Sequence, residues 1–168
     1  MRIRGEQYDV PAPDSPWSEV LPGLWMGGHE FRGPSGRLEP AVVRDEFDLV
    51  QSLLRLPGHG PDAGIEHHVW PIPDGPLDGT QLAGVMRLAL AASEALDTGR
   101  SVLVRCYSGY NRSGLVVAQA LVHQGRTTEE AIRLVRARRS PWALHNELFV
   151  AYLRAGLSTA RLLEELAE

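Results

Sequence analysis

The chain has 168 residues, 43% of them hydrophobic and 23% charged, which is an ordinary balance for a globular domain with a full core. Its formal net charge is −4, so it has no overall basic field to attract nucleic acid or anionic lipid. All 17 basic residues are arginine, which removes the lysine-rich patch typical of inositol-lipid binding. The single cysteine excludes an internal disulfide and favours a cytoplasmic location.

We predict one domain over residues 1–168, with no secretory signal and no membrane-spanning segment. The first residues lack the apolar centre of a signal peptide, and no apolar run approaches the roughly 18 residues that cross a bilayer. Residues 1–16 contain Pro11, Pro13 and Pro16 and are expected to form an irregular lead-in.

The N-terminal part after this lead-in predicts a hairpin followed by a loop. Pro22-Gly23 marks a turn between two short apolar stretches, so residues 17–28 are expected to pair at one edge of a sheet. Residues 29–40 are rich in glycine and proline and are expected to be a loop.

The rest of the chain predicts strands that alternate with helices, and then helices alone. Such alternation implies an α/β fold with a mainly parallel central sheet flanked by helices, and the helical C-terminal third is expected to cover one face. The strands are expected at residues 47–54, 65–72 and 101–105. The helices are expected from Asp78 or Thr80 to Asp97, from Ser113 to Gln124, after a Thr127 cap, from a Ser140 cap to Ala155, and after a Ser158 cap.

The most informative stretch runs from Val102 to Gly114. A β-branched strand ends in Cys106, and a five-residue loop leads to Arg112 and Ser113 at the start of a buried helix. The N–H groups of such a loop converge on one point, where the helix dipole adds partial positive charge. A thiolate is a nucleophile, and a guanidinium binds phosphate through a rigid fork. The stretch therefore predicts attack by Cys106 on the phosphorus of a bound phosphate ester.

The pattern Cys-x5-Arg-Ser after a strand resembles the phosphate-binding loop of the protein tyrosine phosphatase superfamily. The short chain and its Leu21-Pro22-Gly23-Leu24 stretch resemble the compact dual-specificity branch. This resemblance implies hydrolysis of phosphotyrosine, and of phosphoserine or phosphothreonine, through a phosphocysteine intermediate without metal or cofactor. The implied substrate is a phosphorylated protein or a small phosphate ester.

The residues of the loop then take defined roles. Arg112 would hold two oxygens of the phosphoryl group, and Ser113 would donate a hydrogen bond to the departing sulfur of Cys106. The remaining loop residues would bind phosphate mainly through backbone N–H groups: Tyr107, Ser108, Gly109, Tyr110 and Asn111. Gly109 allows a backbone conformation that a side chain would hinder.

An acid must also protonate the leaving oxygen, and Asp74 and Asp78 are the candidates. Asp74 lies in a loop that follows a strand, at the sheet edge where ligands bind in open α/β folds. The stretch from Trp70 to Gly75 also resembles the general-acid loop of the family. We therefore prefer Asp74 and expect Asp78 to cap the next helix.

One position departs from the family pattern. Arg105 stands where the family usually has the histidine that orders the loop and helps to hold the thiolate. This departure leaves a second hypothesis open, a weakly active or inactive module that binds phosphate or phosphoproteins. A rhodanese-like sulfur transferase is disfavoured, because its loop lacks this spacing and gives Asp74 no task.

Residues in the C-terminal third carry a weaker resemblance. Arg139, Asn146 and Phe149 resemble the tail of dual-specificity phosphatases, where a polar residue and an aromatic one support the active-site loop. A position on the helix surface or in the core would explain them equally well. The histidines show no spacing typical of a metal site.

Overall fold

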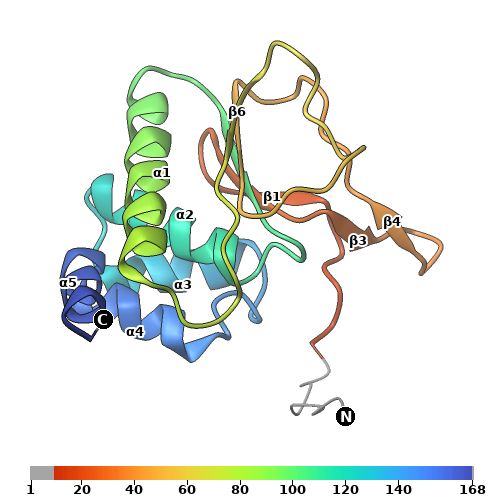
Figure 1. Cartoon of the computed structure of the whole chain (residues 1–168). Helices are drawn as coiled ribbons and strands as arrows, with labels where there is room; N and C mark the ends of the chain where they lie inside the picture. Colours follow the sequence, from red (N-terminus) through yellow and green to blue (C-terminus); the bar gives the residue numbers. More distant parts are fainter. Residues whose placement is uncertain (1–9, 168) are drawn as a thin grey trace.

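The computed structural model describes residues 10–167 and centres on a five-stranded sheet with the order β1-β2-β7-β5-β6 (Figure 1). The first two strands form an antiparallel hairpin, and β2, β7, β5 and β6 are parallel to one another. The predicted edge hairpin and the mainly parallel sheet are therefore confirmed. The strands are β1 (Trp17–Leu21), β2 (Leu24–Gly27), β5 (Leu49–Ser52), β6 (Glu66–Val69) and β7 (Val102–Arg105).

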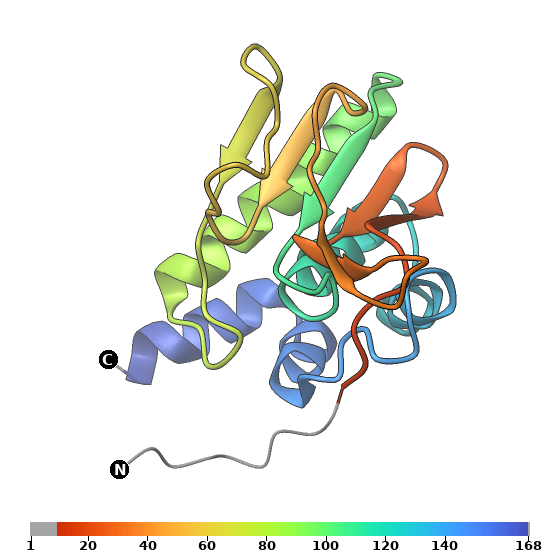
Figure 2. The same cartoon turned by 90° about the vertical axis from the view of Figure 1, so that its right-hand side faces the viewer.

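The helices gather on one side of this sheet, as Figures 1 and 2 show. The main hydrophobic core lies between them and the sheet, and α2 is buried around most of its surface, as its sequence predicted. The predicted helical C-terminal third is confirmed. The helices are α1 (Gly79–Asp97), α2 (Arg112–His123), α3 (Thr128–Arg138), α4 (Glu147–Ala155) and α5 (Leu157–Ala167).

Loops rather than helices cover the opposite face of the sheet. A small second core forms there around Val50 and Leu103, and the ring of Phe47 packs edge-on against Trp17 and Trp25 at 5.4 and 5.9 Å. Side chains alternate along a strand, so the last residues of β5 and β7 project toward this loop layer. This alternation decides where Arg105 points.

The prediction of a loop over residues 29–40 was wrong in part. The segment contains a second, two-stranded sheet of β3 (Glu30–Arg32) and β4 (Leu38–Pro40). Gly36 turns the chain between them with a φ of 78°. Three-residue strands are too short to show an alternating pattern, and the glycines of the turn hid them.

The starts of the last two helices also differ from the prediction. Ser140-Pro141 opens a turn, and Leu144 then adopts a φ of 58°, which interrupts any helix before α4. Asn146 caps α4 by accepting a hydrogen bond from the N–H of Leu148 at 3.1 Å. Ser158 lies inside α5 rather than before it, because the helix begins at Leu157.

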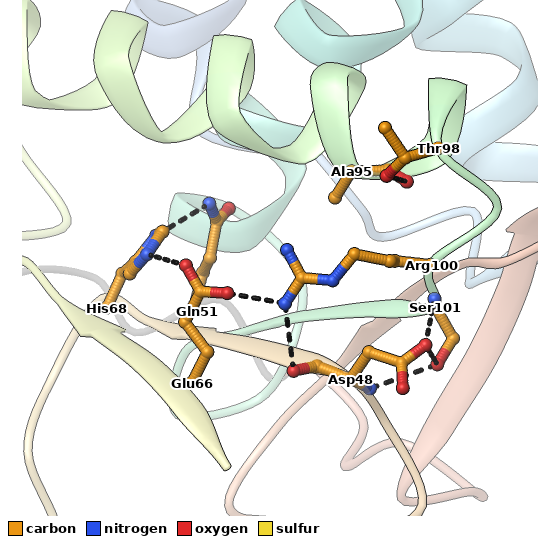
Figure 3. Close-up of polar contacts among 8 residues, drawn as sticks. All are labelled: Asp48, Gln51, Glu66, His68, Ala95, Thr98, Arg100 and Ser101. Atoms are coloured by element: carbon orange, nitrogen blue, oxygen red, sulfur yellow. Dashed lines mark hydrogen bonds and ion pairs between the residues drawn. The ribbon is translucent and has the colours of Figure 1, made fainter.

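A polar network ties the beginnings of the parallel strands together at one edge of the sheet (Figure 3). Asp48, just before β5, accepts hydrogen bonds from the N–H and hydroxyl of Ser101 at 2.8 and 3.2 Å. Arg100 pairs with Glu66 at the start of β6. The carboxyl ends of the parallel strands lie on the opposite side of the sheet from this network, and ligands bind at the carboxyl ends in open α/β sheets.

The lead-in can be compared with its prediction only in part. Residues 1–9 lie outside the described residues, and residues 10–16 contain neither helix nor strand. Within the described part of the chain, no helix combines the length and the apolar character needed to cross a membrane.

Candidate active site

The predicted loop begins at the end of β7 and enters α2 at Arg112. Cys106 is 3% exposed, and its Sγ lies 3.2 Å from the hydroxyl oxygen of Ser113. The Nη1 of Arg112 donates to the carbonyl of Ile72 at 3.3 Å. Its Nε is buried and has no hydrogen-bond partner within residues 10–167. A buried guanidinium N–H requires an acceptor, and an anion in the loop would provide one.

The N-terminus of α2 lacks the side-chain cap that most helices have. Asn111 occupies the cap position, but its side chain makes no capping hydrogen bond to the helix. The amide instead donates to Asp74 at 3.0 Å and to Nε2 of His145 at 3.2 Å. The first N–H groups of α2 therefore remain free for a ligand, and the helix dipole favours a negatively charged one.

Every backbone carbonyl from Cys106 to Asn111 accepts a hydrogen bond from outside the loop. A trans peptide group directs its C=O and N–H in opposite directions, so carbonyls held outward leave the N–H groups pointing inward. The pairs are Cys106 with the ring Nδ1 of His29 (2.8 Å), Tyr107 with the N–H of His29 (2.7 Å), Ser108 with Nη2 of Arg139 (3.0 Å), Gly109 with Nε of Arg139 (3.2 Å), Tyr110 with the N–H of Leu144 (3.0 Å) and Asn111 with the N–H of Leu115 (2.8 Å).

Glycines permit the close approach of the loop to the end of β2. Gly109 has a φ of 76°, and a Cβ there would lie 2.5 Å from the carbonyl of Gly27. A Cβ on Gly28 would lie 2.5 Å from the carbonyl of Tyr107. Only residues without side chains fit at these two positions, which lets the chain after β2 run alongside the loop.

Asp74 faces the loop, as its position after β6 predicted. Its two carboxylate oxygens accept hydrogen bonds from the side-chain amides of Asn111 (3.0 Å) and Asn146 (2.8 Å). The alternative candidate, Asp78, caps α1 by accepting from the N–H of Gln81 at 2.7 Å. The prediction that Asp78 caps the helix is confirmed.

Most of the predicted residues meet around one hollow of about 310 Å³, which Gly109 and Ser113 do not border. Cys106, Arg112 and Asp74 line it, together with His145 and residues of the loop. Tyr107 is 44% exposed at its rim, whereas Tyr110 is buried and donates its hydroxyl to the carbonyl of Pro11 at 2.8 Å. Nowhere in residues 10–167 do three or more His, Cys, Asp or Glu side chains gather as a metal site would require.

Arg105 turns away from this hollow toward the loop layer. Its buried guanidinium donates to the hydroxyl of Ser52 (3.0 Å) and to the carbonyls of His59 (2.9 Å) and Gly60 (2.7 Å). Burial lowers the pKa of Arg105 to about 10, so the side chain stays charged at neutral pH. It lines a different hollow of about 530 Å³, which none of the predicted site residues borders.

Comparison with known proteins gives the fold. The sequence matches no protein-family model and no curated protein. Human DUSP28 superposes on it with a TM-score of 0.67 at 24% identity, covering 86% of this chain and 95% of that one. The chain has the fold of the compact dual-specificity phosphatases.

Two further solved structures support this fold. A mouse putative dual specificity phosphatase complexed with zinc tungstate gives a TM-score of 0.66 at 23% identity, covering 95% of this chain and 96% of that one. The human tyrosine phosphatase-like serine/threonine/tyrosine-interacting protein gives 0.60 at 21% identity, covering 88% and 97%. The fold is therefore found both in a putative phosphatase and in a phosphatase-like protein.

The sequence did not reveal, or left open, the part that several residues play in shaping this candidate site. Arg139 and Asn146, which it left open, contact the loop and Asp74, whereas Phe149 is a buried core residue. His29 lies in the segment predicted as a loop, and the sequence indicates no role for it. The one signal for it was the Gly27-Gly28 pair, which allows the next residue to approach a neighbouring backbone.

Proposed function

We propose that the protein is a cysteine-dependent phosphatase for phosphotyrosine and phosphoserine or phosphothreonine esters. The observation that carries the proposal is the shared hollow, onto which Cys106, Arg112 and Asp74 all open. A nucleophile, a phosphate clamp and a proton donor are the groups that a transfer through phosphocysteine requires. The phosphatase-like fold agrees with this function.

In the first step, the thiolate of Cys106 attacks phosphorus, an S–P bond forms and the P–O bond to the leaving group breaks. Arg112 and the inward N–H groups bind the three remaining phosphoryl oxygens, where negative charge spreads in the transition state. Protonated Asp74 donates its proton to the leaving oxygen. The amides of Asn111 and Asn146 keep this carboxyl aimed at the hollow.

In the second step, water attacks phosphorus, the S–P bond breaks and inorganic phosphate leaves. Asp74, now a carboxylate, takes a proton from the water. The hydroxyl of Ser113, which lies 3.2 Å from Sγ, donates to the departing thiolate. The charge and the proton return to their starting positions.

A second candidate is a module that binds phosphate or phosphoproteins without turnover. Arg105 favours this binding module, because its side chain points away from the loop, whereas the family usually has a histidine here that orders the loop. The two candidates share the anion-binding loop and differ in hydrolysis.

Hydrolysis of p-nitrophenyl phosphate tests the choice. We expect the wild type to turn over, Cys106→Ser to be inactive while still binding tungstate, and Asp74→Asn to lose about a hundredfold to a thousandfold in kcat. Asp78→Asn is the matched control and should keep its kcat within about threefold. A folded wild type that binds tungstate but never turns over would rule out the phosphatase and leave the binding module.

A comparison of phosphorylated peptides then tests the substrate class. Loop residues 107–111 carry no basic side chain. Recognition of a peptide substrate should therefore depend mainly on the phosphoryl group and on the side chain that carries it. We expect kcat/KM to be measurable for both phosphotyrosine and phosphothreonine peptides. Activity on phosphotyrosine alone would restrict the proposal to that substrate.

A further inference from the structure

The carbonyl of Cys106 receives its hydrogen bond from a residue distant in the sequence. The preceding residue, Arg105, is occupied elsewhere: its three donor nitrogens reach Ser52, His59 and Gly60. Arg105 therefore has no donor left for the carbonyl of Cys106. A buried carbonyl without a hydrogen bond is costly, so another residue must donate to it.

His29 meets this need from the end of β2. Its ring Nδ1 lies 2.8 Å from the carbonyl oxygen of Cys106, and its backbone N–H donates to the carbonyl of Tyr107 at 2.7 Å. The side chain has no exposed surface. β2 and β7 run parallel with Gly27 opposite Arg105, so the residues that follow each strand emerge side by side.

The chemistry of the ring defines which nitrogen carries the proton. Burial lowers the pKa of His29 to about 4, and the nearby charge of Arg105 contributes in the same direction, so the ring is neutral at physiological pH. A neutral imidazole has one N–H, and a carbonyl can only accept. The hydrogen therefore sits on Nδ1, and Nε2 is the bare nitrogen.

The two hydrogen bonds of His29 act on two successive peptide groups of the loop. In a trans peptide, the carbonyl of Cys106 points opposite to the N–H of Tyr107, and the carbonyl of Tyr107 opposite to the N–H of Ser108. By holding both carbonyls outward, His29 turns both N–H groups toward the anion site. Without the ring donor, the first peptide group would lose its partner and could rotate.

We propose that His29 is the positioning residue of the phosphate-binding loop, holding the peptide group after Cys106 in the anion-binding orientation. His29, which follows β2, thus orders the loop in place of the histidine that the family usually has before the cysteine. The side chain of Arg105 instead binds the loop layer on the other face of the sheet. The consequence for turnover rests on the proposed function, whereas the consequence for anion binding does not.

Two variants whose side chains have the same number and branching of heavy atoms separate the hydrogen bond from packing. His29→Leu removes the donor, whereas His29→Asn places an amide nitrogen close to the position of Nδ1. We expect tungstate, titrated by calorimetry, to bind His29→Leu at least roughly tenfold more weakly than wild type. His29→Asn should bind within about threefold of wild type, and the alkylation rate of Cys106 by iodoacetamide should follow the same order.

Equal tungstate affinity in the folded Leu and Asn variants would overturn the proposal. If His29→Leu fails to fold, the wild type itself provides the test by long-range ¹H–¹⁵N NMR of its imidazoles. An Nδ1–H tautomer for His29 supports the proposal, and an Nε2–H tautomer overturns it. Neither measurement requires turnover, so an inactive wild type with intact tungstate binding would refute the phosphatase alone.

Discussion

Replacement of Arg139 by methionine tests the outer hydrogen bonds of the loop. The guanidinium lies largely buried behind the loop and donates to the carbonyls of Ser108 (3.0 Å) and Gly109 (3.2 Å). It also donates to the carbonyl and the hydroxyl of Ser15 at 2.9 and 3.2 Å, which anchors the segment before β1. Methionine fills similar volume but offers no donor, so the partly buried carbonyls would lose their partners.

The size of the effect follows from the two loop carbonyls. A buried polar group left without its partner costs about 1–3 kcal/mol, and these two partly buried carbonyls take the lower half of that range, about 2.5 kcal/mol together. With a urea dependence of roughly 2.5 kcal/mol per molar, the unfolding midpoint should fall by about 1 M. Tungstate affinity should also fall, because the N–H groups of the same peptides are the proposed donors to the anion.

Urea unfolding followed by circular dichroism measures the first effect and calorimetry the second. Arg138→Met is the matched control, since Arg138 is the exposed neighbour on α3, and it should change stability by less than about 0.5 kcal/mol. Arg139→Lys should be intermediate, because one ammonium group cannot reproduce the fork. Equal stability of Arg139→Met and Arg138→Met would refute the reasoning.

Three further predictions concern the loop glycine, the buried histidine and the far edge of the sheet. Gly109→Ala should abolish tungstate binding while keeping its helix content, because its Cβ meets backbone at 2.5 Å; Gly36→Ala, at a similar φ of 78° with open space around it, should still bind. The pKa of His29 is 6.5 in the unfolded chain and about 4 in the folded protein, so protonation at low pH favours unfolding. Between pH 7 and pH 4.5, the wild type should therefore lose about 2.5 kcal/mol more stability than His29→Asn, as measured by urea unfolding. Arg100→Ala breaks an exposed ion pair and should cost about 1 kcal/mol or less, with kcat unchanged.

Each of these has a clear contrary result. Tungstate binding by Gly109→Ala would show that the loop can move away from β2. A stability difference between wild type and His29→Asn that stays constant with pH would show that the ring is not held neutral by the fold. A large loss of kcat in Arg100→Ala would show that the edge in Figure 3 is coupled to the site.

The local part of the site could be predicted because its residues are neighbours in sequence. Cys106, Arg112 and Ser113 are held together by one strand-to-helix turn, and that turn has a recognisable composition. Asp74 could be predicted because it follows a parallel strand, and parallel strands end at the same edge of the sheet.

The hydrogen bonds to most of the loop carbonyls could not be predicted, because their donors are distant in the sequence. Whether His29 or any other donor reaches the carbonyl of Cys106 depends on β2 lying beside β7, and strand order is a property of the whole fold. Arg105 shows the same limit, since its partners Ser52, His59 and Gly60 lie about 45 to 53 positions away in the sequence. The turn at Leu144 was hidden because nothing in a leucine predicts a positive φ.

The outward carbonyls of the loop have a consequence for the folding of the protein during its synthesis. Apart from Leu115, their donors lie near residue 29 and near residues 139–144, on both sides of the loop in sequence. A fragment that contains only the strand, loop and helix around Cys106 would therefore lack the partners that shape it. During synthesis, the thiol site can form only after the segment through Leu144 has left the ribosome and packed against the earlier strands. Anion binding by Cys106 and its neighbours would thus report that the segments around His29 and Leu144 have packed against the loop.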